Sequence, residues 1–203
     1  ITGGLAGDGA EFSERLVGAD DSPRANRVAA IGFYGSTIRI GHGSAGGWDV
    51  FGPRRCITKS IGNLLIELDG EPALNLYERY LGEEDARGLP GTALLFPLQI
   101  SDPAQPESLI MRTVLAVDRQ KRTMTFAGDM PEGYRAQLMR GNFDRLIEGA
   151  AQAAEQAKGA DGGEQIAILV SCIGRKLLLG QRIDEEVEAV RGVLGERAHL
   201  RGF

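Results

Sequence analysis

The stretch that decides the fold is IAILVSCIGR, which runs from Ile166 to Arg175. Its first half is a near-continuous apolar run, typical of a strand that is covered on both faces. Gly174 then lets the backbone turn and approach a neighbour closely, because glycine carries no β-carbon. We therefore predict a strand over 165–171 that leads into a turn, with Cys172 at the strand end.

The end of this strand carries the most suggestive chemistry in the chain. Ligands often bind beyond the carboxyl ends of strands, and Arg175 offers a planar, permanently charged fork for a carboxylate or phosphate. The alternative for this side chain is an ion pair on the surface with Glu185 or Glu186. Cys172 is expected to be a buried structural thiol, because the sequence shows no base beside it.

The rest of the sequence predicts groups of consecutive strands separated by three main helices. Helices are predicted from Pro72, from Asn142 as N-cap to Lys158, and from Asp184. The apolar pattern predicts strands over 12–17, 27–33, 37–40, 55–60, 63–68, 93–100, 109–117, 123–126 and 134–139, with 27–40 as a hairpin. The sequence therefore predicts an α+β fold with largely antiparallel sheets and two sub-domains, 1–62 and 63–203.

A glycine-rich segment precedes the only tryptophan, Trp48. Gly41, Gly43 and Gly46 match the spacing of a dinucleotide-binding loop, but that function requires a helix to begin directly after them. No helix is predicted there, so we interpret the segment as a glycine-rich loop. His42 and Trp48 within it can line a pocket.

Composition narrows the function classes. The net charge of −5 and the lack of clustered basic residues argue against a nucleic-acid partner. No apolar run approaches the roughly 18 residues of a membrane span. Two histidines and two cysteines, all distant in sequence, show no metal-ligand spacing. With no catalytic motif and two thiols expected to be reduced, the sequence predicts a cytoplasmic protein that is not an enzyme.

Four segments, taken in order, resemble one known family. They are TGGLAGD at 2–8, GWD at 47–49, LDGEPALNLY at 68–77 and FAGDMPEG at 126–133, and the opening stretch at 166–175 joins them. Together they resemble the FIST domain family, with residues 1–62 similar to the last part of its N-terminal half. Residues 63–203 are similar to most of its C-terminal half.

The resemblance implies an intracellular sensory module of bacterial signal transduction that binds a small ligand, such as an amino acid or another carboxylate. Output then passes through a partner such as a histidine kinase or a cyclase. On this hypothesis Cys172, Gly174 and Arg175 form the ligand site, with Trp48 and Asp129 as walls and no cofactor.

Three alternatives stay open. The resemblance also implies a haem-binding nitric oxide sensor, for which His42 is the best axial ligand and His199 the second. A cysteine-dependent enzyme at Cys172 and a protein-interaction module without a ligand are the other two.

Overall fold

The computed structural model describes residues 3–8, 14–159 and 165–202. The chain divides into two compact units, and each is treated separately below. Unit 1 consists of Ile1–Gly47 together with Asn142–Phe203, and unit 2 is Trp48–Gly141. The sub-domains predicted at 1–62 and 63–203 follow the two halves of the family and stay a prediction.

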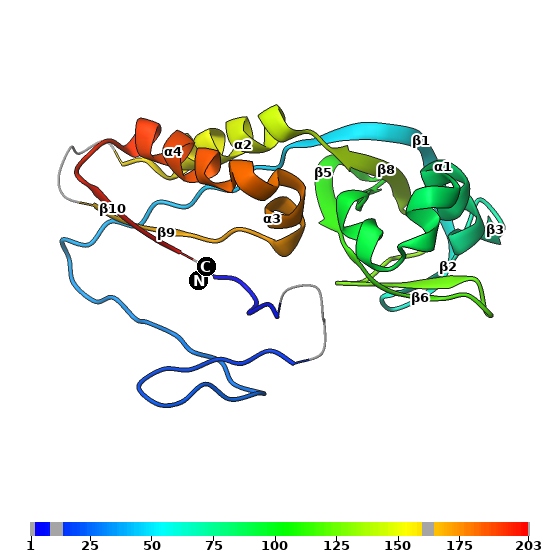
Figure 1. The fold of residues 1–203 in the computed structure, drawn as a ribbon, viewed down its shortest axis with the longest axis horizontal. Helices are drawn as coiled ribbons and strands as arrows, with labels where there is room; N and C mark the ends of the chain where they lie inside the picture. Colours follow the sequence, from blue (N-terminus) through cyan, green and yellow to red (C-terminus); the bar gives the residue numbers. More distant parts are fainter. Residues whose placement is uncertain (1–2, 9–13, 160–164, 203) are drawn as a thin grey trace. The chain divides into compact units, whose positions relative to one another are not determined.

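Unit 2 is built on an eight-stranded sheet in the order β5-β4-β8-β1-β2-β7-β6, with β3 paired to β2 (Figure 1). Every strand pair in it is antiparallel. The α+β fold with largely antiparallel sheets is thus confirmed. The strands are β1 (Trp48–Ile61), β2 (Leu64–Leu68), β3 (Glu71–Pro72), β4 (Leu98–Asp102), β5 (Gln105–Arg112), β6 (Val114–Asp118), β7 (Thr123–Phe126) and β8 (Arg135–Gly141).

One helix covers the core of unit 2. Helix α1 (Ala73–Arg87) begins directly after Pro72, as predicted, and departs from helical geometry at Gly82, where φ is +79°. Its apolar face packs with side chains from the sheet, and the largest of these that are fully buried are Phe126, Ile57, Leu65, Ile100 and Met124. On α1 itself Leu76 and Tyr77 are buried.

Unit 1 contains the other α-helices and a small parallel sheet. They are α2 (Phe143–Ala157), α3 (Ile173–Leu179) and α4 (Ile183–Leu194), while β9 (Gln165–Leu169) pairs in parallel with β10 (Ala198–Gly202). Helices α2 and α4 lie side by side (Figure 1). Asn142 caps α2, because its Oδ1 accepts a hydrogen bond of 3.2 Å from the backbone N–H of Arg145, so the predicted N-cap is confirmed.

The decisive stretch differs from its prediction in two ways. Among the described strands, β9 pairs with β10 alone, and Ile166 and Ile168 are 74% and 59% exposed. The expectation of a strand covered on both faces was wrong, because an apolar run does not reveal how many layers pack on it. The predicted turn was also wrong, since residues 173–179 form α3 with Cys172 as its N-cap.

Several predicted strands are corrected as well. Residues 27–40 form no hairpin and no strand, because apolar alternation favours an extended chain but a strand also needs a partner. Residues 91–95 form a short 3₁₀ helix, so β4 begins only after Pro97, which lacks an N–H. The run 109–117 is divided between β5 and β6, which pair with different strands. The strand predicted at 12–17 begins outside the described residues.

The glycine-rich segment of unit 1 packs directly on the backbone of α2. A β-carbon built on Gly41 would lie 1.8 Å from the carbonyl oxygen of Ala157, and one on Gly43 would lie 1.8 Å from that of Ala153. One on Gly47 would lie 2.4 Å from the α-carbon of Leu146. These glycines therefore permit close contact with a helix. A strand, β1, follows them, which confirms that no dinucleotide-type helix begins there.

Candidate functional site

The candidate site lies where β9 gives way to α3. Cys172 is the N-cap of α3, and its Sγ accepts a hydrogen bond of 3.4 Å from the backbone N–H of Arg175. The cysteine is exposed, so the expectation of a buried thiol was wrong. An N-cap side chain folds back over the helix start, which keeps this sulfur at the surface.

Arg175 reaches from α3 to two other helices. Its Nε donates a hydrogen bond of 2.6 Å to Oε1 of Glu186 in α4. Its Nη2 contacts the same carboxylate oxygen and also donates to the backbone carbonyl of Leu146 in α2. The arginine and glutamate side chains are 13% and 9% exposed. The ion pair between Arg175 and Glu186, one of the two that we considered for the surface, is therefore present, but it is largely buried.

A serine completes this arrangement. The hydroxyl of Ser171 donates a hydrogen bond of 3.2 Å to Oε2 of Glu186, so both carboxylate oxygens are occupied. We call Ser171, Cys172, Arg175, Glu186 and the carbonyl of Leu146 the Arg175–Glu186 cluster. A guanidinium beside a carboxylate matches the two opposite charges of an amino acid, because each can bind the group of opposite sign.

A second, exposed set of ion pairs joins α2 to α4. The Nη2 of Arg182 lies 3.1 Å from Oδ1 of Asp144, and its Nε lies 2.7 Å from Oε1 of Glu185. The hydrogen bonds to Glu185 and then to Asp144 raise the pKa of the Arg182 guanidinium. Its guanidinium also lies 5.8 Å from the ring centre of Phe143. The helices that hold the buried pair are thus also connected at their surface.

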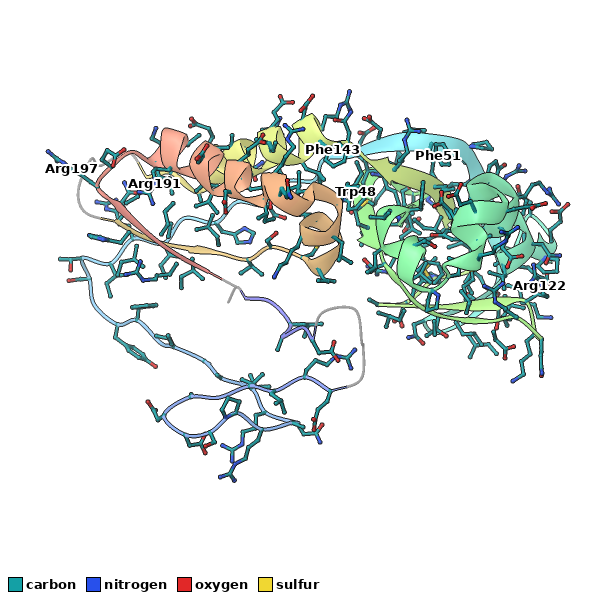
Figure 2. All side chains as sticks on the ribbon, in the orientation of Figure 1. Trp48, Phe51, Arg122, Phe143, Arg191 and Arg197 are labelled. Atoms are coloured by element: carbon teal, nitrogen blue, oxygen red, sulfur yellow. The ribbon has the colours of Figure 1, made fainter. Side chains whose placement is uncertain are left out.

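The structure brings together three of the five predicted ligand-site residues. Cys172, Gly174 and Arg175 share the start of α3 in unit 1, where Gly174 is buried. Trp48 and Asp129 belong to unit 2. Trp48 is the half-buried first residue of β1 (Figure 2), and Asp129 is exposed after β7. Their role as walls of the site stays a prediction.

The two histidines do not build a metal site. In the described part of the chain, no group of three or more histidine, cysteine, aspartate or glutamate side chains could hold a metal ion. His42 and His199 are both exposed, and the glycines on either side of His42 contact the backbone of α2. An exposed histidine on a segment so closely packed offers no enclosed apolar slot for haem. We therefore assign no step to haem, and the haem alternative stays a prediction.

Sequence reasoning missed Ser171, the Leu146 carbonyl and helix α3 itself. The sequence contained only a partial signal for the helix, because an apolar pattern follows Cys172 and ends at Gly180, the C-cap of α3. The burial of Glu186 had no signal of its own. It lies among three acidic residues at the start of α4, and an acidic first turn is ordinarily solvated.

Two protein-family models match the chain. Residues 1–71 match the FIST N domain and residues 73–203 match the FIST C domain. The two matches cover nearly the whole chain and define it as a sensory signal-transduction domain. The chain belongs to the FIST domain family.

Two other comparisons add no relative. Neither a curated protein nor a solved structure matches the chain. Among the described residues, no helix combines the length and the apolar character needed to cross a membrane.

Proposed function

We propose that the chain is a sensory module that binds a free amino acid at the Arg175–Glu186 cluster and signals through a partner protein. The observation that carries this proposal is the largely buried ion pair between Arg175 and Glu186 at the end of β9. A ligand with a carboxylate and an ammonium group can replace that pair with two new ones. The carboxylate binds the Arg175 fork, and the ammonium binds Glu186.

Charge balance favours a zwitterion over a simple carboxylate. A carboxylate alone would take Arg175 and leave Glu186 buried without a cation, and an uncompensated buried charge costs several kcal/mol. An amino acid avoids this cost because it compensates both side chains. Ser171, which already donates to Glu186, then helps to hold that carboxylate in place.

The cluster also supplies a route from binding to output. Arg175 joins α3 to α4 through Glu186 and to α2 through the Leu146 carbonyl. A ligand that inserts into the ion pair changes how these three helices are held together, and so shifts the population of their arrangements. A partner such as a histidine kinase or a cyclase would detect that shift.

Binding is tested by titrating the full chain with single amino acids and following its ¹H–¹⁵N NMR spectrum. We expect saturable shifts at Ser171, Cys172 and Arg175 for one class of amino acid, and none for the matching deaminated carboxylic acid. Arg175→Lys should weaken binding at least about tenfold, because lysine cannot make the bidentate contact with the ligand carboxylate. The control is Arg191→Lys, at an exposed position of α4 (Figure 2), and this variant should bind the amino acid as wild type does.

Two results would count against the proposal. If no amino acid shifts these signals, the cluster is purely structural. If the deaminated acid binds as well as the amino acid, Glu186 takes no part. The fluorescence of Trp48, the only tryptophan, separately tests its predicted role as a wall, since it should change on binding only if Trp48 contacts the ligand.

A further inference from the structure

Unit 2 presents a polar sheet face that its core does not use. The register of the strands aligns side chains in two neighbouring rows across β1, β8, β4 and β5. One row is Arg54, Gln137, Gln99 and Met111, and the next is Cys56, Arg135, Ser101 and Leu109. Because directly opposed residues point to the same side of a sheet, these two rows share one face.

The opposite face of the same strands is the core. Leu98, Ile100, Ala136 and Leu138, which alternate with the rows above, are all buried. The polar face has a shallow depression at its centre, which is open to solvent. Six of its lining residues come from the two rows, namely Arg54, Gln99, Ser101, Leu109, Arg135 and Gln137, and Ala136 contributes from between Arg135 and Gln137.

The depression contains two cations and no carboxylate. Within the described residues, Arg135 makes neither a hydrogen bond nor an ion pair, and Arg54 makes only one long hydrogen bond, 3.4 Å from Nε to Oε1 of Gln137. Five other arginines of unit 2 each pair with a carboxylate, namely Arg55, Arg79, Arg87, Arg119 and Arg122. The charge of Arg135 acts on the Asp69 carboxylate without a direct ion pair, so Arg54 and Arg135 both keep donors available for a ligand.

The floor of the depression is fixed and rich in donors. The amide of Gln137 is held because its Nε2 donates a hydrogen bond of 2.7 Å to the carbonyl of Gly52. Ser101 is largely buried and also lines the depression. The side-chain amide of Gln99 makes a long contact of 3.9 Å to the sulfur of Met111. Hydroxyl, amide and guanidinium donors on one rigid sheet suit an acceptor with several oxygens.

We propose that this depression binds a phosphate group, either as inorganic phosphate or as the phosphomonoester of a small molecule. A tetrahedral oxyanion can accept from both guanidinium groups and from the Ser101 hydroxyl at the same time. The depression is shallow and encloses no ligand-sized cavity. A phosphate group would therefore bind on the open face, and the remainder of an ester would extend along Leu109. The site lies in unit 2 and is independent of the amino-acid site in unit 1.

The test is an NMR titration of the full chain with sodium phosphate and, separately, with O-phosphoserine, each against sodium chloride at equal ionic strength. We expect saturable shifts of the backbone signals of Gln99, Ser101 and Arg135. Arg54→Gln and Arg135→Gln should each weaken binding about tenfold or more, because each removes charge-assisted hydrogen bonds. Arg54→Lys and Arg135→Lys keep the positive charge but lose the planar guanidinium. Their affinity for phosphate should therefore lie between that of the glutamine variants and that of wild type.

Arg140→Gln is the matched control. Arg140 lies on the same strand, β8, but at the alternate position, where its guanidinium stacks 5.1 Å from the ring centre of Phe51. Tighter binding of O-phosphoserine than of phosphate would identify an ester as the ligand, and equal binding would identify phosphate itself. The proposal is overturned if chloride gives the same shifts, or if Arg140→Gln weakens binding as much as Arg135→Gln. All variants replace exposed side chains, and the spectrum itself reports whether each is folded.

Discussion

A β-carbon on Gly43 would stand 1.8 Å from the carbonyl oxygen of Ala153, so the backbones of the glycine-rich segment and α2 are in direct contact. The contact is reinforced by a hydrogen bond of 3.1 Å from the backbone N–H of Ser44 to Oε1 of Gln156. Since a side chain cannot fit there, these glycines are required by packing. A nucleotide is not needed to explain them.

Gly43→Ala should therefore separate the segment from α2. We expect a loss of about 1–3 kcal/mol in the stability of that packing, seen as faster hydrogen exchange of the α2 amides. Gly192→Ala is the control, because a β-carbon there meets nothing within 4 Å and φ is not positive. Its effect should be a gain of about 0.5–1 kcal/mol, since alanine favours a helix interior. Equal exchange in the two variants would contradict this packing.

Glu186→Gln should strongly destabilise unit 1. It leaves the Arg175 guanidinium largely buried without a counter-charge, which costs about 3–5 kcal/mol. The measurement is hydrogen exchange of α3 and α4 amides, with Glu185→Gln as the neighbouring control. Glu185 pairs with Arg182 at the surface, so this control should remain close to wild type. A Glu186→Gln protein as stable as the control would show that the buried pair contributes little.

Tyr77→Phe should weaken unit 2 by about 1 kcal/mol. The buried Tyr77 hydroxyl donates a hydrogen bond of 2.6 Å to the carbonyl of Phe96, and the change leaves that carbonyl without its donor. Urea unfolding followed by Trp48 fluorescence measures this loss. Tyr34→Phe, at a tyrosine that is 90% exposed, should leave the midpoint unchanged. A shift of the same size in both variants would contradict the role of the hydrogen bond.

The same tyrosine should make unit 2 sensitive to base. Burial raises the pKa of Tyr77 well above its usual range. Because the folded pKa is raised, the stabilisation is complete below the unfolded value of about 10 and is lost as the pH rises above it. Unfolding of wild type between pH 9 and about 12 should therefore be steeper than that of Tyr77→Phe. Parallel curves for the two proteins would refute this linkage.

Asp69 should contribute to stability in the opposite pH range. A hydrogen bond of 2.7 Å from the backbone N–H of Cys56, and then the guanidinium of Arg55, lower the pKa of the Asp69 carboxyl. Because the folded pKa is depressed, the contribution is present above the unfolded value of about 3.9 and is lost as the pH falls through the folded value. Acid unfolding of Asp69→Asn should thus depend less on pH than that of wild type. Glu84→Gln, at an exposed position of α1, should follow wild type.

Local signals predicted much of unit 2 and the start of α2. Gly62, with φ of +57°, lies in the turn between β1 and β2, and glycine and asparagine at 62–63 mark that hairpin in the sequence. Pro72 stands at the start of α1 and Asn142 at the start of α2, so each residue marks the beginning of its own helix in the sequence. These features could be predicted because each depends on neighbours a few residues away.

Other features depend on partners distant in the sequence and could not be predicted. The alternation at 27–40 resembles a strand, but nothing local reveals that no strand pairs with it. The exposed face of β9 and the burial of Glu186 are decided by which elements pack nearby. At the candidate site the residue types were therefore predictable. The pairing of Arg175 with Glu186 was one of two expected surface pairs, and its contact with the Leu146 carbonyl was not predicted.

The register that pairs Trp48 with Gly141 places the two ends of unit 2 opposite each other on neighbouring strands. The chain thus leaves unit 1, completes unit 2 and returns at the same point, so that unit 2 is an insertion with adjoining ends. During synthesis, all of unit 2 emerges before α2, α3 and α4 exist. The glycine-rich segment must therefore wait for its helix, and the Arg175–Glu186 cluster can form only after α4 has been synthesised.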